Sequence, residues 1–283
     1  MQRATPRLAA AEKVFGDLDA LDRDLDSYEK QRRLRIFVVQ PGAIRVGVIA
    51  VKTLSVGHAE MLPTIMASKR GVDDEQAKAL VTAARTIAAK HHDPAVLAAL
   101  AEAEFDAGNR PEAIAAADRA IALDPAAKNA FVQKGLALFA TVEDADDRDA
   151  AYLTAMRPFQ ALNRLENDHP YPLIYFYRSF TERGKDPPET ARHALERAAD
   201  LAPFDQGLAW EAGQMLAQEG SVAASIGRLS PLAANPHGGG LARLAQAMIT
   251  FLGDKPEGVR VDLSNFAGPV PEIQATSEEP AAQ

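Results

Sequence analysis

A recurring pattern of small residues constrains the fold of this 283-residue chain more than any other feature. The stretch from 101 to 125 reads AEAEFDAGNRPEAIAAADRAIALDP. A Gly-Asn-Arg-Pro turn signal divides it into two alanine-rich segments. Alanine favours helix, and small side chains let two helices approach each other closely. The stretch therefore predicts a pair of closely packed antiparallel helices.

The same pattern recurs along the chain at intervals of about 34 residues. In the clearest copy, 94–125, Leu97 and Leu100 lie on the first helix and Gly108 lies at the turn. Ala113 and Ala117 lie on the second helix. Arrays of this kind need end helices that hide the last repeats. Weaker copies in the same phase are predicted at 128–165, 173–203 and 213–236. A lone second helix is predicted before the first copy at 75–94, and a closing helix after the last at 241–253.

This pattern resembles the tetratricopeptide repeat (TPR), whose unit is two antiparallel helices. The resemblance covers roughly 75–253, although the first helices carry mostly Leu, Phe and Ala where the TPR pattern prefers Trp and Tyr. It implies a mainly α fold, a TPR-like solenoid of helical hairpins wound as a right-handed superhelix. A small N-terminal helix and a β-hairpin region are expected in front of it. We assign the solenoid to 74–253.

The flanking segments differ from the array in composition. Residues 1–33 are expected to hold a polar helix, and its narrow apolar stripe, which includes Leu25 and Tyr28, predicts at most weak self-association. Residues 34–73 are assigned to a β-hairpin and linker, because two β-branched runs flank a Pro-Gly turn signal. Residues 254–283 are rich in Pro, Glu, Ala and Ser and are predicted to form a flexible tail.

The TPR resemblance implies a concave face, lined by the first helix of each repeat, on which proteins of this type bind peptides or partner proteins. The corresponding positions include Trp, Tyr and Arg, which are enriched at interface hot spots. An alternative interpretation is that Tyr175 and Trp210 only pack between helices. The predicted groove residues are Glu102, Gln133, Leu136, Tyr171, Tyr175, Arg178, Gln206, Trp210 and Gln214.

One TPR subclass holds a C-terminal carboxylate with Lys and Asn side chains. The matching positions here carry Ala98 and Glu102. Because a glutamate would repel a carboxylate, the sequence does not predict this ligand class.

Several functional classes are disfavoured by the sequence. A net charge of −8 argues against general nucleic-acid binding, which requires a basic surface. No apolar run is long enough to predict a membrane span. The chain has no cysteine, and it lacks phosphate-loop, dinucleotide-binding and zinc-peptidase motifs. We therefore predict a protein that is not an enzyme, with no catalytic or metal-binding residues and no cofactor.

A narrower resemblance is carried by the SKRGVD segment followed by LAEAEFDAGN and AIAAADRAIALDP. This order is similar to the C-terminal half of bacterial proteins that join a zinc-peptidase-like domain to TPRs. The main prediction is a scaffold that binds a partner protein or peptide. The alternative is the non-catalytic recognition half of such a metallopeptidase-like protein. No signal peptide is seen, so a cytoplasmic location is the default expectation, and a periplasmic one applies if the chain is a fragment.

Overall fold

The computed structural model describes residues 12–30, 47, 51 and 53–268. The chain divides into two compact units, Met1–Thr53 and Leu54–Gln283, each of which is described by itself. In the first unit, α2 (Leu18–Glu29) begins at Asp17, whose carboxylate accepts a hydrogen bond from the amide of Asp19 at 2.9 Å. The side chains of Leu25 and Tyr28 on this helix are each 53% exposed. Self-association through this helix stays a prediction.

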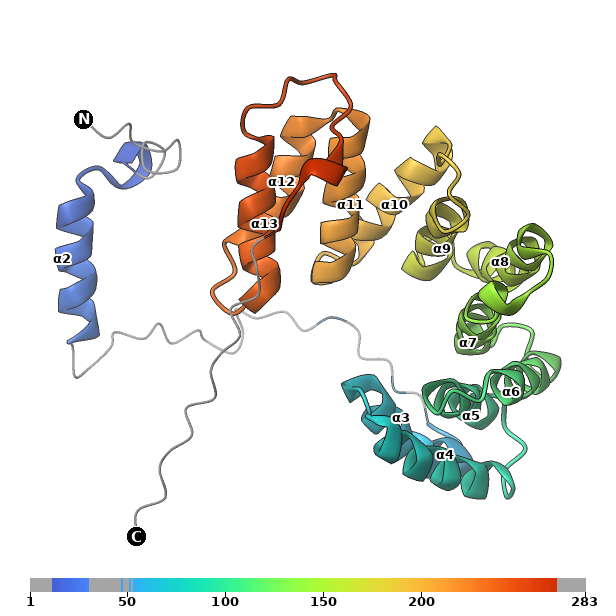
Figure 1. The fold of residues 1–283 in the computed structure, drawn as a ribbon. Helices are drawn as coiled ribbons and strands as arrows, with labels where there is room; N and C mark the ends of the chain where they lie inside the picture. The colour runs from blue at the N-terminus through green and yellow to red at the C-terminus, as the bar shows by residue number, and fades with distance from the viewer. Residues whose placement is uncertain (1–11, 31–46, 48–50, 52, 269–283) are drawn as a thin grey trace, which may run out of the picture. The chain divides into compact units, whose positions relative to one another are not determined.

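The second unit is a series of helical hairpins in which consecutive helices pack side by side (Figure 1). The first helix of each hairpin also contacts the first helix of the next hairpin over the α3–α5–α7 part of the array. The helices are α3 (Val56–Arg70), α4 (Asp74–Ala88), α5 (Pro94–Asp106), α6 (Arg110–Leu123), α7 (Lys128–Phe139), α8 (Arg148–Leu165), α9 (Pro170–Thr181), α10 (Glu189–Leu201), α11 (Gln206–Glu219), α12 (Val222–Ala233) and α13 (Gly239–Leu252). Short 3-10 helices η2 (Val142–Asp144) and η3 (Leu263–Asn265) lie between α7 and α8 and after α13.

The small residues of the sequence pattern lie between the helices. Ala113, Ala117 and Ala120 on α6 are all fully buried. On α7, Gly135 lies directly under the ring of Phe159 from α8, and a Cβ at this glycine would lie 2.5 Å from the ring. Because no side chain separates these helices, a large aromatic ring fits between them. The predicted array of helical hairpins is thus confirmed.

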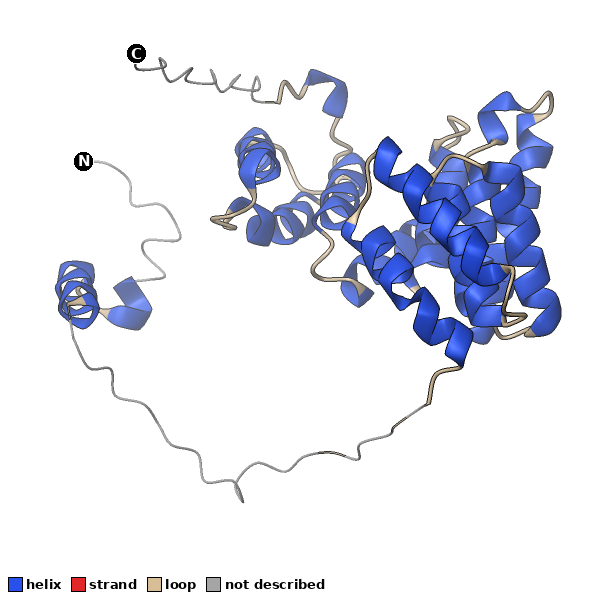
Figure 2. Cartoon of the chain, turned by 90° about the horizontal axis from the view of Figure 1, so that it is seen from below, coloured by secondary structure: helices blue, strands red, loops and turns tan. Residues whose placement is uncertain are grey.

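The predicted β-hairpin region is wrong for the residues that the structure describes, which form helices and loops and include no strand (Figure 2). Most of 34–55 lies outside the described residues. The linker assigned up to residue 73 is largely the helix α3. Ser55 caps this helix by accepting a hydrogen bond from the amide of His58 at 3.1 Å, and Gly71, with φ of +89°, ends it.

Helix α3 is held by packing against the array. Its Met61 side chain is fully buried in the cluster that contains Leu80 of α4 and Leu97 of α5. Burial of this kind stabilises a helix even where the local sequence pattern does not favour one. Helix α4, which was predicted to be a lone second helix, therefore pairs with α3.

The flexible tail predicted for 254–283 is wrong for its first part. Residues 254–268 fold back onto α11, α12 and α13, and Val261 is only 8% exposed. A few apolar residues, Val261 and Phe266 among them, suffice because a preformed apolar surface receives them. Residues 269–283 lie outside the described part of the chain.

Apart from these two corrections, the four-part division of the chain stays a prediction. Within the described residues, no helix is both long and apolar enough to cross a membrane.

Candidate functional site

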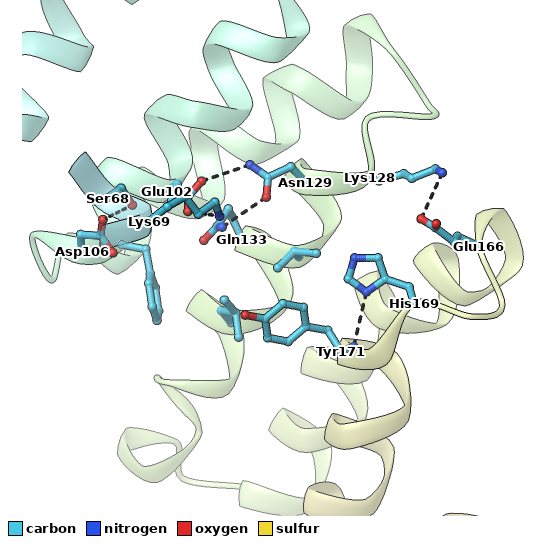
Figure 3. Close-up of a pocket in the computed structure, with 13 residues that line it drawn as sticks. Ser68, Lys69, Glu102, Asp106, Lys128, Asn129, Gln133, Glu166, His169 and Tyr171 are labelled. Atoms are coloured by element: carbon cyan, nitrogen blue, oxygen red, sulfur yellow. Dashed lines mark hydrogen bonds and ion pairs between the residues drawn. The ribbon is translucent and has the colours of Figure 1, made fainter. Parts of the chain in front are cut away.

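A groove of about 530 Å³ runs along the face of the array formed by α3, α5, α7 and the start of α9 (Figure 3). It is built from the first helices of successive hairpins, because side chains at equivalent positions of a repeat line up along one face. Its lining combines charged, amide and apolar side chains. These residues are Ser68, Lys69, Glu102, Phe105, Asp106, Lys128, Asn129, Val132, Gln133, Leu136, Glu166, His169 and Tyr171.

A chain of polar contacts crosses the groove and links three helices. The Lys69 ammonium of α3 forms an ion pair with the Glu102 carboxylate of α5. The other oxygen of Glu102 accepts a hydrogen bond from Asn129 Nδ2 of α7 at 3.3 Å, and Asn129 Oδ1 accepts one from Gln133 Nε2 at 3.4 Å. Glu102 is 7% exposed, so these contacts supply the partners that a buried carboxylate requires.

The chain of contacts ends at the carbonyl oxygen of Gln133. This side chain is 3% exposed, and its Oε1 atom is buried without a hydrogen-bond partner among the described residues. A buried carbonyl without a donor costs about 1–3 kcal/mol.

The α3 end of the groove carries a second, half-buried carboxylate. Asp106 accepts a hydrogen bond from the Ser68 hydroxyl at 2.6 Å (Figure 3). Burial raises the pKa of Asp106, and the nearby Glu102 charge raises it further. The Ser68 hydrogen bond and the Lys69 charge oppose this rise.

The opposite end lies where α8 is followed by α9. Lys128 and Glu166 form an ion pair at 3.0 Å on the rim. His169 precedes α9, and its Nδ1 accepts a hydrogen bond from the amide of Tyr171 at 3.4 Å. Burial lowers the pKa of His169, because it disfavours the charged imidazolium. The Tyr171 ring is 39% exposed and stacks on His169, with ring centres 5.7 Å apart.

The structure brings together Glu102, Gln133, Leu136 and Tyr171 of the predicted groove residues. Tyr175 instead stacks on Phe159 with ring centres 4.6 Å apart, and burial raises its pKa.

The other predicted groove residues belong to the α9–α11 part of the array. Arg178 pairs with Glu211 of α11 at 2.5 Å, and the hydrogen bond from its guanidinium raises its pKa. Gln206, Trp210 and Gln214 lie on α11 and do not line this groove. The ring of Trp210 packs near that of Phe266, 6.3 Å between centres. Whether any of these residues contacts a partner stays a prediction.

Sequence reasoning missed several residues of this groove. Asn129 lies four positions before Gln133, so helical spacing could have placed it on the same face. Ser68 and Lys69 could not be found, because α3 was predicted as a linker. Among the described residues, no group of three or more His, Cys, Asp or Glu side chains is arranged to hold a metal ion.

Comparison with solved structures identifies the fold as that of a TPR protein. The structure of TTC0263, a thermophilic TPR protein of Thermus thermophilus, matches with a TM-score of 0.56 and 14% identity. The match covers 69% of this chain and 100% of that chain. MamA (residues 41 to the end) of Desulfovibrio magneticus RS-1 matches with a TM-score of 0.45 and 15% identity, over 63% of this chain and 94% of that chain. No family model and no curated protein matches the sequence.

Proposed function

We propose that this protein is a scaffold that binds an extended segment of a partner protein in the groove formed by α3, α5, α7 and α9. The mixed lining of the groove carries the proposal, because apolar side chains such as Val132 and Leu136 lie beside charged and amide groups on successive first helices. An extended peptide presents main-chain N–H and C=O groups to polar side chains and its own side chains to apolar ones.

The apolar lining supports the same ligand class. Phe105, Val132 and Leu136 line the groove together with the partly exposed ring of Tyr171. Apolar walls around a few fixed polar groups are typical of peptide and ligand sites, since burial supplies affinity and the polar groups set orientation. The rim carries charges of both signs, which favours a segment without a strong net charge.

The proposal is tested by quantitative pull-down from native lysate with matched variants. Tyr171→Ala removes a ring from the groove, and Gln133→Asn withdraws the amide by one methylene while keeping its polarity. Phe204→Ala is the control, because this ring is 95% exposed in the loop before α11. We expect the two groove variants to weaken capture of the same partner by roughly tenfold or more, as hot-spot truncations do.

Equal capture by the wild-type protein, both groove variants and the control would contradict the proposal. The alternative, a recognition half of a metallopeptidase-like protein, is supported by none of the contacts described above and stays a prediction.

A further inference from the structure

Residues 254–268, here called the C-terminal strap, follow a path that an independent peptide could take. The strap leaves the end of α13, passes the turn between α11 and α12, and returns along α11 and α13 (red in Figure 1). Gly268 comes so close to α13 that a Cβ there would lie 2.7 Å from Leu244 Cδ1.

Main-chain and side-chain donors of the strap bind the end of α11. The amide of Val261 donates to the carbonyl of Ala217 at 3.1 Å, and the amide of Gly258 donates to that of Gly220 at 2.9 Å. Arg260 Nε donates to the carbonyl of Gln218 at 3.1 Å. Carbonyls at the end of a helix have few partners within the helix, so a segment of any chain can bind them. The carbonyl of Ala217 also accepts from the amide of Gly220 at 2.9 Å.

Gly220 makes this approach possible. Its φ is +93°, and a Cβ at this position would lie 2.8 Å from the backbone of Val259. The residue both ends α11 and leaves room for the strap. The surface is therefore shaped to let the strap backbone approach closely.

Three apolar side chains of the strap, Val261, Leu263 and Phe266, pack against this surface. Val261 is 8% exposed and lies in the cluster with Leu229 and Met248. Phe266, five residues later, packs between Phe251 of α13 and Trp210 of α11, with ring centres 5.6 and 6.3 Å away. In contrast, Val259 is 55% exposed, so the surface receives only some of the apolar side chains of the strap.

We propose that the strap is a ligand bound in cis, and that the surface beneath it is a second binding site of the scaffold. The site takes a segment with a branched aliphatic residue and, five positions later, an aromatic residue, with one 3-10 turn between them like that of η3. The strap occupies this site in the described state, so a partner segment of the same chemistry must displace it. This inference concerns the α11–α13 surface and goes beyond the function proposed for the α3–α9 groove.

The contacts that hold the strap are of a kind that can open locally. The ion pair between Arg260 and Asp186 joins side chains that are 67% and 65% exposed, and such exposed pairs contribute little stability. The Glu257 carboxylate of the strap also accepts a hydrogen bond from the exposed amide of Ala223 at 2.9 Å. Segments with few buried anchors open without unfolding of the core. A tethered segment competes at a local concentration in the millimolar range, which sets how strongly it shields the site.

The test uses the full chain and a synthetic peptide of residues 256–268, PEGVRVDLSNFAG. The double variant Val261→Asp with Phe266→Ala releases the strap and leaves the surface beneath it intact. Trp210 is the only tryptophan of the chain and reports binding through its fluorescence. We expect saturable binding to the variant and at least about tenfold weaker binding to the wild-type chain. A peptide with Phe266→Ala should bind the variant roughly tenfold more weakly.

Binding of the peptide to neither protein, or equally to both, would overturn the proposal. If the double variant does not fold, hydrogen exchange on the wild-type chain tests the proposal instead. We expect the amides of Gly258 and Val261 to exchange roughly tenfold or more faster than the core amides of α11. Exchange of strap and core at the same rate would identify the strap as a fixed part of the fold and reject displacement.

Discussion

Gly135 shows how one residue sets the distance between two helices. A Cβ there would meet the Phe159 ring, so Gly135→Ala should lower the free energy of unfolding by about 1–3 kcal/mol through overpacking. Gly227 on α12 is the matched control, because nothing lies within 4 Å of its Cβ position. Gly227→Ala should raise the stability by roughly 0.5–1 kcal/mol. Urea unfolding measures both, and equal effects would contradict the packing described.

Asp106 should make stability depend on pH in a defined direction. Its pKa in the folded protein is raised above the ordinary 3.8 by burial, so folding disfavours the ionised form. This destabilisation is present at neutral pH and disappears as the pH falls through the raised pKa toward 3.8. Asp106→Asn keeps an acceptor for Ser68 and should be more stable than the wild type at pH 7.

The stability difference between Asp106→Asn and the wild type should shrink toward pH 4. It is followed by denaturant unfolding of both proteins across this range. A difference that grows on acidification would show that the carboxylate is stabilised by its surroundings.

At single positions, the sequence predicted which helix face a residue occupies better than what covers that face. Glu102 and Gln133 line the groove, because the phase of the repeat fixes which way their side chains point. Tyr175 shares that phase, but the rings of Phe139 and Phe159 cover it. Trp210 lies next to Phe266, a residue of the predicted tail. Such contacts join distant parts of the chain, so local pattern could not show them.

Between elements, the pair Arg178–Glu211 links α9 to α11. The two guanidinium nitrogens Nε and Nη2 each donate to a carboxylate oxygen, and both side chains are partly buried. A double-mutant cycle with alanine at both positions should give a coupling free energy of about 1 kcal/mol. The control is Arg197–Asp168, which has a 3.0 Å contact but side chains 55% and 61% exposed. Its coupling should be close to zero, and equal values would contradict this difference.

Helices with a strong repeat pattern were predicted from sequence, whereas α3 and the strap were not. Helix α3 contains Pro63 and follows a run of β-branched residues, so local preference favoured a hairpin and linker. The face of α3 around Met61 is buried only because α4 and α5 pack against it. The strap likewise lacks a core of its own and orders by contact with α11 and α13.

At the scale of the whole array, the groove exists only because successive hairpins keep one register. The contacts of Glu102 with Lys69 and Asn129 join α3, α5 and α7 and require all three helices in place. Neighbouring repeats contribute to one continuous surface in solenoids, so a partner segment would contact several hairpins at once. Binding and the stacking of the hairpins are then coupled.

Site-specific photo-crosslinking tests the central claim most directly. A benzophenone amino acid replaces Tyr171 in the groove or, as a control, Leu153, which is 64% exposed on α8. The account predicts a crosslink from position 171 to one short segment of a partner protein, and no crosslink to that segment from position 153. Crosslinks to the same partner from position 153 alone, or from both positions alike, would place the interaction outside the groove and contradict the account.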